Sequence, residues 1–193
     1  MTITRQMVFA KRPTGAITLD TFRLTETKLT ALNDGDVLVK NLWLSLDPYM
    51  RGRLSDAKSY VKGVEIGEVM VGQTVGEVIE SRHPGFAPGA HVLTSLGWQT
   101  HGIARGTELS LVDGQRAPLS YYLGVLGMPG LTAYFGLYEI GQPRAGNTVV
   151  VSAASGAVGS VVGQLAKISG CRVVGIAGGQ AKCDYVTSVL GFD

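Results

Sequence analysis

The sequence has few of the residues on which disulfide, metal and nucleic-acid chemistry depend. Among its 193 residues are two cysteines and three histidines, and the formal net charge is only +2. Cys171 opens an apolar strand-like run and Cys183 begins a helix-like one, so both are expected to be reduced core thiols. His83, His91 and His101 are too widely spaced, in turn-rich sequence, to predict a metal site. The sequence has no basic cluster of the kind that would predict nucleic-acid binding.

Long apolar runs are also missing. No segment reaches the ~18 residues that a membrane-spanning helix needs, and the first residues lack the apolar core of a signal peptide. We therefore expect no membrane association and a cytoplasmic protein. Glycine, by contrast, is abundant: 27 residues, about twice the usual share of ~7%. This composition favours tight turns and β structure.

The most informative segment joins an apolar run at 147–151 to a helical pattern at 160–168. Between them, Ala153, Gly156 and Gly159 have the spacing A-x-x-G-x-x-G, and a second strand-like run follows at 171–177. Strand, glycine turn, helix and strand together are typical of a dinucleotide-binding unit. There the helix N-terminus offers free N–H groups to a pyrophosphate, and the glycines leave room for it. The alternative is an ordinary tight strand-to-helix turn.

The rest of the chain divides near residue 118. The first part has alternating or apolar strand-like runs separated by Pro-Gly turns, which favours a barrel or sandwich. The second part has helical patterns before the glycine turn. Strands are expected at 36–46, 72–80, 90–95 and 97–104, and helices at 121–126 and 131–140. The sequence stops where a third parallel strand is expected, which predicts a truncated chain.

Four blocks of sequence resemble one family, in order. They read L-S-L-D-P-Y-M-R-G at 44–52, L-G-M-P-G-L-T-A-Y at 126–134, the glycine-turn block at 149–167, and G-C-R-V-V-G-I-A-G at 170–178. The sequence resembles the prostaglandin reductase / leukotriene B4 12-hydroxydehydrogenase family of zinc-free medium-chain dehydrogenase/reductases. Within that family it is most similar to the bacterial NADPH-dependent curcumin reductase branch.

The resemblance implies an α/β plus β fold class. A GroES-like β-barrel domain, residues 1–118, carries the substrate and is followed by the first βαβα part of a Rossmann doubly wound domain, residues 119–193. Both domains are expected to be incomplete here. The resemblance also implies a homodimer for the full-length protein.

The cofactor is expected to be NADP(H). An NAD site usually has an acidic residue at the end of the second strand, for the ribose 2′-hydroxyl; here 177–180 reads Ala-Gly-Gly-Gln, and Lys182 follows. A cation there suits a 2′-phosphate, although Lys182 is alternatively a solvated helix residue. With the resemblance, the expected cofactor-binding set is Met128, Thr132, Ala153, Gly156, Ala157, Val158, Gly178 and Lys182.

The chemistry is expected to be reduction of an activated C=C bond. Zinc-dependent relatives use a Gly-His-Glu motif, and the corresponding segment 63–67 has no histidine, so no metal is expected. Tyr49, after the Asp47-Pro48 turn, is the candidate catalytic donor to the developing enolate oxygen; alternatively it only lines the site or closes the barrel mouth. Arg51 either attracts an acidic substrate tail or pairs with Asp47 or Asp56.

The sequence thus predicts an NADPH-dependent oxidoreductase that transfers hydride to enones or enals. Two alternatives stay open. One is a quinone reductase on the same scaffold, and the other is a cofactor-binding module without turnover.

Overall fold

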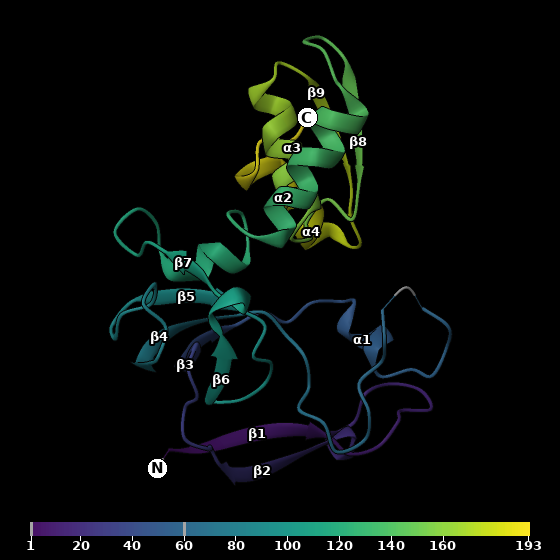
Figure 1. The fold of residues 1–193 in the computed structure, drawn as a ribbon. Coiled ribbons are helices and arrows are strands. Elements are labelled where there is room, and N and C mark those ends of the chain that lie inside the picture. The colour runs from purple at the N-terminus through teal and green to yellow at the C-terminus, as the bar shows by residue number, and fades with distance from the viewer. Residues whose placement is uncertain (1, 60) are drawn as a thin grey trace. The chain divides into compact units, whose positions relative to one another are not determined.

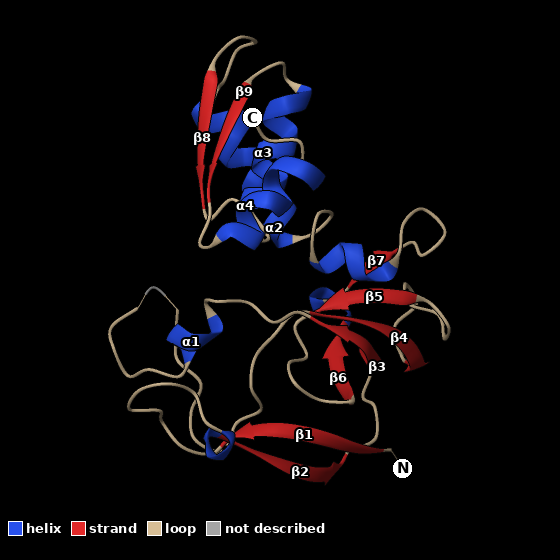
Figure 2. Cartoon of the chain, turned by 180° about the vertical axis from the view of Figure 1, so that it is seen from behind, coloured by secondary structure: helices blue, strands red, loops and turns tan. Residues whose placement is uncertain are grey.

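The computed structural model describes residues 2–59 and 61–193. The chain divides into two compact units, unit 1 (Met1–Ser120) and unit 2 (Tyr121–Asp193) (Figure 1). Strands and loops dominate unit 1, whereas helices and one strand pair make up unit 2 (Figure 2). Every helix in the two described ranges is too short or too polar to cross a membrane.

Unit 1 contains two antiparallel sheets. One pairs β1 with β2, and the other has the strand order β6-β3-β4-β5-β7. The elements are β1 (Ile3–Phe9), η1 (Leu19–Thr21), β2 (Phe22–Lys28), β3 (Asp36–Leu44), α1 (Met50–Arg53), β4 (Thr74–Ser81), β5 (His91–Thr94), β6 (His101–Arg105), η2 (Gly106–Glu108) and β7 (Ser110–Val112).

Two apolar clusters hold unit 1 together. The first lies on the five-stranded sheet, where Val37, Val39 and Val92 are fully buried. The second lies beneath α1 and includes Met50 and Met70 together with Phe9, Leu54 and Val64. Because Met50 belongs to this second cluster, the position of α1 is fixed by the core of the unit.

The strand expected at 97–104 is wrong for its first four residues, since β6 begins only at His101. Gly97 has φ +77°, and a Cβ there would stand 2.4 Å from the Met70 carbonyl oxygen. The next residue, Trp98, donates its backbone N–H to Met70 O (2.8 Å) and accepts from Met7 N (2.8 Å). The segment therefore joins β1 to the loop before β4, which places the Trp98 ring in the second cluster.

Unit 2 is built around a parallel strand pair. β8 (Thr148–Ser152) and β9 (Arg172–Ile176) pair in register from Thr148–Arg172 to Ser152–Ile176, and α3 (Gly159–Ile168) connects them. The helices before the pair are η3 (Leu119–Leu123), which begins in unit 1, α2 (Met128–Tyr134) and η4 (Phe135–Gly141); those after it are α4 (Gln180–Asp184) and η5 (Tyr185–Val189). This β-α-β-α order after a β unit confirms the expected fold class.

The core of unit 2 lies where α3 crosses the strand pair. Val151, Ala166 and Val173 are buried there with Phe192. Gly163 faces the Phe192 ring so closely that a Cβ would stand 1.8 Å from Cζ. Glycine at this helical position therefore leaves free the space that the Phe192 ring occupies in the core.

We expect Gly163→Ala to lower the free energy of unfolding of unit 2 by about 1–3 kcal/mol, the usual cost of overpacking a core. Gly136→Ala is the matched control, because a Cβ at Gly136 meets nothing within 4 Å and alanine is the better helix former. Urea unfolding followed by circular dichroism measures both variants. Equal stability of the two would contradict the packing described for Phe192.

Asp36 anchors the start of β3. Its carboxylate accepts hydrogen bonds from Asn33 N (2.9 Å) and Asn33 Nδ2 (3.1 Å), and it pairs with Arg105 at 3.0 Å. The backbone N–H of Asn33, followed by Arg105, lowers the pKa of Asp36 below the ordinary value of 3.8. These bonds connect β3 to β6 and to the preceding turn.

The lowered pKa of Asp36 makes stability depend on pH in the acid range. A carboxyl group whose pKa is lower in the folded state stabilises the fold above its unfolded pKa, and this contribution is lost as the pH falls through the folded pKa. We expect the free energy of unfolding to fall between about pH 5 and pH 2, and to fall less in Asp36→Asn. Asp34→Asn changes an exposed neighbour and should show the same dependence of the free energy of unfolding on pH as the wild type. Urea unfolding at a series of pH values measures this dependence. If Asp36→Asn also matched the wild type, Asp36 would not have the stabilising role described.

Candidate functional site

The turn between β8 and α3 has the form of an anion-binding loop. Ala153 begins it with φ +48°, a left-handed conformation that non-glycine residues rarely adopt. Gly156 N then donates to Ala153 O (2.8 Å), and Ser160 N donates to Gly156 O (2.9 Å). The chain therefore reverses tightly from the strand end into the first turn of α3.

Gly159 permits the helix to approach the strand. It is buried, and a Cβ there would stand 2.4 Å from Ala153 O. On the other side of the turn, Ala154 N donates to Ile176 O (3.0 Å), which links the turn to the end of β9. Backbone packing on both sides thus fixes the conformation of the turn.

Ala157 and Val158 present backbone N–H groups at this turn. Within the described part of the chain, neither N–H donates a hydrogen bond. Ala157 is exposed and Val158 half-buried, and both lie directly before the ten-residue helix α3. Free N–H groups at a helix N-terminus are the groups that bind phosphate oxygens. The turn therefore fits a pyrophosphate.

The end of β9 forms the second side of this candidate site. Gly178 and Gly179 follow the strand and are exposed, and a Cβ on either would meet nothing within 4 Å. Lys182 lies in α4, exposed, and takes part in no ion pair with any described residue. The one carboxylate in α4, Asp184, accepts from Gln180 Nε2 (2.8 Å). The Lys182 ammonium group, without an ion pair to any described residue, therefore follows closely after the exposed turn at Gly178 and Gly179.

Met128 and Thr132 lie on α2, which packs against α3. The start of the helix has no room for side chains at two positions. A Cβ would stand 2.1 Å from Tyr122 O at Gly127, which precedes the helix, and 1.8 Å from Val125 O at Gly130, in its first turn. The Thr132 hydroxyl donates to Met128 O (2.7 Å). Both side chains are exposed.

Tyr49 lies in unit 1, at the residue that precedes α1. The Asp47-Pro48 turn leads into the helix, with Met50 N donating to Asp47 O (3.0 Å) and Arg51 N to Pro48 O (3.2 Å). The Tyr49 side chain is 41% exposed. The turn therefore holds the phenol at the surface of unit 1 and not in its core.

Arg51 forms neither of the ion pairs considered for it. Its guanidinium donates to Gly15 O (2.9 Å), whereas Asp56 pairs with Arg12 at 2.6 Å. Arg51 therefore ties α1 to the loop between β1 and β2. Arg12 also donates to Leu54 O (3.3 Å), so it holds the segment that follows α1.

The predicted residues fall into two groups. All eight expected cofactor-binding residues lie in unit 2, on the glycine turn, on the turn after β9 and on α2, whereas Tyr49 lies in unit 1. In residues 2–59 and 61–193, no cluster of His, Cys, Asp and Glu has the make-up of a metal site. Sequence reasoning missed Trp98, which lies in an apolar pocket of unit 1; its only signal was the Gly97 that precedes it.

Comparison with known proteins gives a consistent result. Residues 5–112 match a family model described as the N-terminal domain of oxidoreductase. The chain is 52% identical to the NADPH-dependent curcumin reductase of Escherichia coli (strain K12) over 189 residues, which are 98% of the chain and 55% of that protein. It is 48% identical to prostaglandin reductase 1 of Oryctolagus cuniculus, covering 89% of the chain and 48% of the relative.

A solved structure is similar over the same region. The crystal structure of CurA in complex with NADPH from Vibrio vulnificus matches with a TM-score of 0.93 and 53% sequence identity, covering 98% of the chain and 56% of that structure's chain. The chain thus spans about half the length of the curated relatives that it matches.

Proposed function

The chain belongs to the zinc-free medium-chain dehydrogenase/reductases, in the branch of the prostaglandin and curcumin reductases, and we propose that the protein is an NADPH-dependent reductase of enones and enals. The observation that carries the proposal is the turn from Ala153 to Gly159, with its free N–H groups and close backbone packing. The similarity to an NADPH-dependent reductase and to an NADPH complex supports the choice of cofactor.

We propose that one domain binds the substrate and the other binds the cofactor. Residues 1–118 form the substrate domain, and residues 119–193 belong to the NADP-binding domain. We also propose a cytoplasmic homodimer for the whole protein, as in the family that the sequence resembles. These assignments rest on the resemblance and on the position of the glycine turn in unit 2.

NADP(H) would be held by groups of unit 2. The N–H groups of Ala157 and Val158 would bind the pyrophosphate, with Gly156 leaving space for it. Gly178 would let the adenosine ribose approach the end of β9, and Lys182 would neutralise the 2′-phosphate. Met128 and Thr132 would border the nicotinamide from α2. No carboxylate at 177–180 opposes a phosphate there.

The substrate would be polarised by the protein itself. When bound, the reduced nicotinamide supplies a hydride for the β-carbon of an enone. As the new C–H bond forms, the C=C π electrons shift and negative charge develops on the carbonyl oxygen, where a facing hydrogen-bond donor lowers the barrier. A proton from a hydroxyl group would then reach the α-carbon and complete the saturated ketone. Tyr49 is the proposed donor, because the Asp47-Pro48 turn holds its partly exposed phenol at the surface of unit 1.

The decisive experiment is a turnover assay at the absorbance band of reduced nicotinamide. The 193-residue chain and a version extended to the length of its relatives are each mixed with but-3-en-2-one and either NADPH or NADH. We expect the extended protein to consume NADPH in preference to NADH and to release the saturated ketone. Tight NADPH binding without consumption would favour a cofactor-binding module, and turnover only with quinones would favour a quinone reductase.

Lys182→Ala should raise the Kd for NADPH about ten- to a hundredfold and leave the Kd for NADH nearly unchanged, because a charge-assisted hydrogen bond to the 2′-phosphate is lost. Isothermal titration of the chain with both nucleotides measures this. Lys182→Arg should retain most of the preference for NADPH. Lys58→Ala removes an exposed lysine from unit 1 and should change neither Kd. Equal losses of affinity for both nucleotides in Lys182→Ala would remove the 2′-phosphate assignment.

A further inference from the structure

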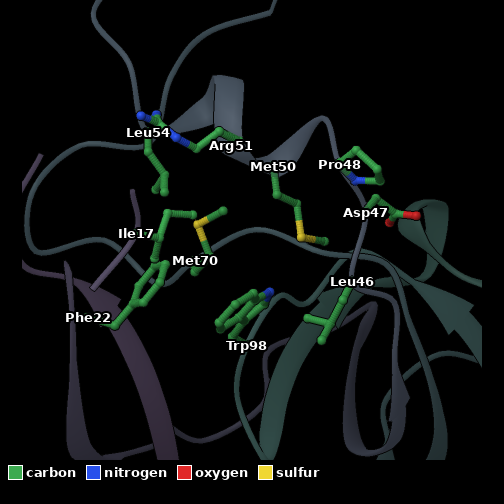
Figure 3. A pocket seen from close by; sticks show the side chains of 10 residues that line it. All are labelled: Ile17, Phe22, Leu46, Asp47, Pro48, Met50, Arg51, Leu54, Met70 and Trp98. Carbon is green, nitrogen blue, oxygen red and sulfur yellow. The ribbon is translucent and has the colours of Figure 1, made fainter. Parts of the chain in front are cut away.

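Unit 1 contains an apolar pocket beneath α1 that no part of the cofactor site uses. Its cavity volume is about 360 Å³, and its walls are almost entirely apolar (Figure 3). Phe22, Leu46, Met50, Met70 and Trp98 line it, and Arg51 stands at one side. The volume suits the apolar part of a small organic molecule.

One polar atom in this apolar pocket has no partner. The indole Nε1 of Trp98 is buried and makes no hydrogen bond to any residue in the ranges 2–59 and 61–193. The ring itself is well fixed, because its backbone bonds to Met7 and Met70 and its centroid lies 5.1 Å from that of Phe22. Buried donors without an acceptor are rare and cost free energy. A fixed, unsatisfied donor in a pocket therefore points to an acceptor that the described residues do not provide.

The Met50 side chain lies beside this donor. The Met50 terminal methyl and Trp98 Cδ1, the ring atom bonded to Nε1, lie 3.0 and 3.3 Å from the position of a Cβ on Gly72. Figure 3 shows the indole nitrogen on the side of the ring nearest to the Met50 side chain. Methionine has three rotatable side-chain bonds and adapts readily to a neighbour. A rotation of the Met50 side chain would expose the N–H to the pocket.

Water alone does not suit the site. An ordered buried water usually makes about three hydrogen bonds. The only charged residues of the lining are Asp47 and Arg51, whose charged ends point away from the indole nitrogen in Figure 3, and the other lining residues are apolar. The acceptor has to arrive with an apolar body that fills the rest of the cavity. An uncharged oxygen on a hydrocarbon frame has this composition.

We propose that the pocket binds the remote end of the substrate, an apolar group with one uncharged oxygen acceptor, and that Trp98 Nε1 donates to that oxygen once Met50 turns aside. The identity of the occupant as substrate rests on the function proposed above. Met50 directly follows Tyr49, so α1 connects the pocket to the proposed donor. Trp98 is then a specificity-determining residue that selects ether, ester or phenol oxygens over hydrocarbon.

Binding can be tested on the 193-residue chain by NMR. The sequence has two tryptophans, Trp43 and Trp98, so the indole N–H region should contain two signals, assigned with Trp43→Phe and Trp98→Phe. The probes are anisole and ethylbenzene, which match in size and differ by an oxygen. We expect anisole to shift the Trp98 indole proton downfield in a saturable manner, and to bind about two- to tenfold more tightly than ethylbenzene, as one net hydrogen bond provides.

Trp98→Phe keeps an aromatic ring but removes the donor together with part of the indole, so its affinity for both probes can change. Because the two probes differ only by the oxygen, the variant should bind them equally tightly. Trp43→Phe, at a half-exposed position on β3, is the matched control and should keep the preference for anisole. Equal affinities in the wild-type chain, or no movement of the Trp98 signal, would overturn the proposal.

Turnover by the extended protein tests whether the occupant is substrate. The two enones are 4-(4-methoxyphenyl)but-3-en-2-one and its 4-ethylphenyl analogue. We expect kcat/KM to be about two- to tenfold higher for the methoxy compound than for the ethyl compound. Trp98→Phe should lose this preference, and Trp43→Phe should keep it. A ratio unchanged in Trp98→Phe would overturn the proposal. If no enone is reduced, the proposed function fails, whereas the NMR titration still decides whether the pocket binds an acceptor.

Discussion

The close approach of α3 to the strand pair is the constraint on which unit 2 depends. Two glycines on one side of the helix make it possible, Gly159 against the Ala153 carbonyl and Gly163 against the Phe192 ring. The first contact shapes the turn proposed to bind the pyrophosphate, and the second closes the core behind it. Because both lie on the same helix, the stability of the unit and the geometry of the turn are coupled.

In unit 1, contacts with the rest of the unit likewise fix the position of α1. The helix is only four residues long and has little stability of its own. It is held from below by Met50 in the apolar cluster and from the side by the bond from Arg51 to Gly15. The Asp47-Pro48 turn then sets the position of Tyr49. One short segment therefore carries the proposed donor, a wall of the pocket and an anchor to the N-terminal loop.

Much of this arrangement follows from the sequence, and the remainder depends on distant contacts. The strand pair, α3 and the glycine turn were predictable because apolar periodicity and turn residues are local signals. The position of Trp98 was not, since the segment after Gly97 looks like a strand and is diverted by bonds to Met7 and Met70. The partner of Arg51 was also unpredictable, because Arg12 takes Asp56 and leaves Arg51 a backbone carbonyl.

The left-handed conformation of Ala153 has a consequence for binding. An alanine in this conformation costs on the order of 1 kcal/mol relative to glycine, and the surrounding backbone bonds and the packing of Gly159 hold it there. Glycine at the same position would relieve that strain but would leave the turn free to sample other conformations. With alanine, the ordering of the loop is completed when the chain folds, so the loop itself would lose less conformational entropy on binding the proposed phosphate.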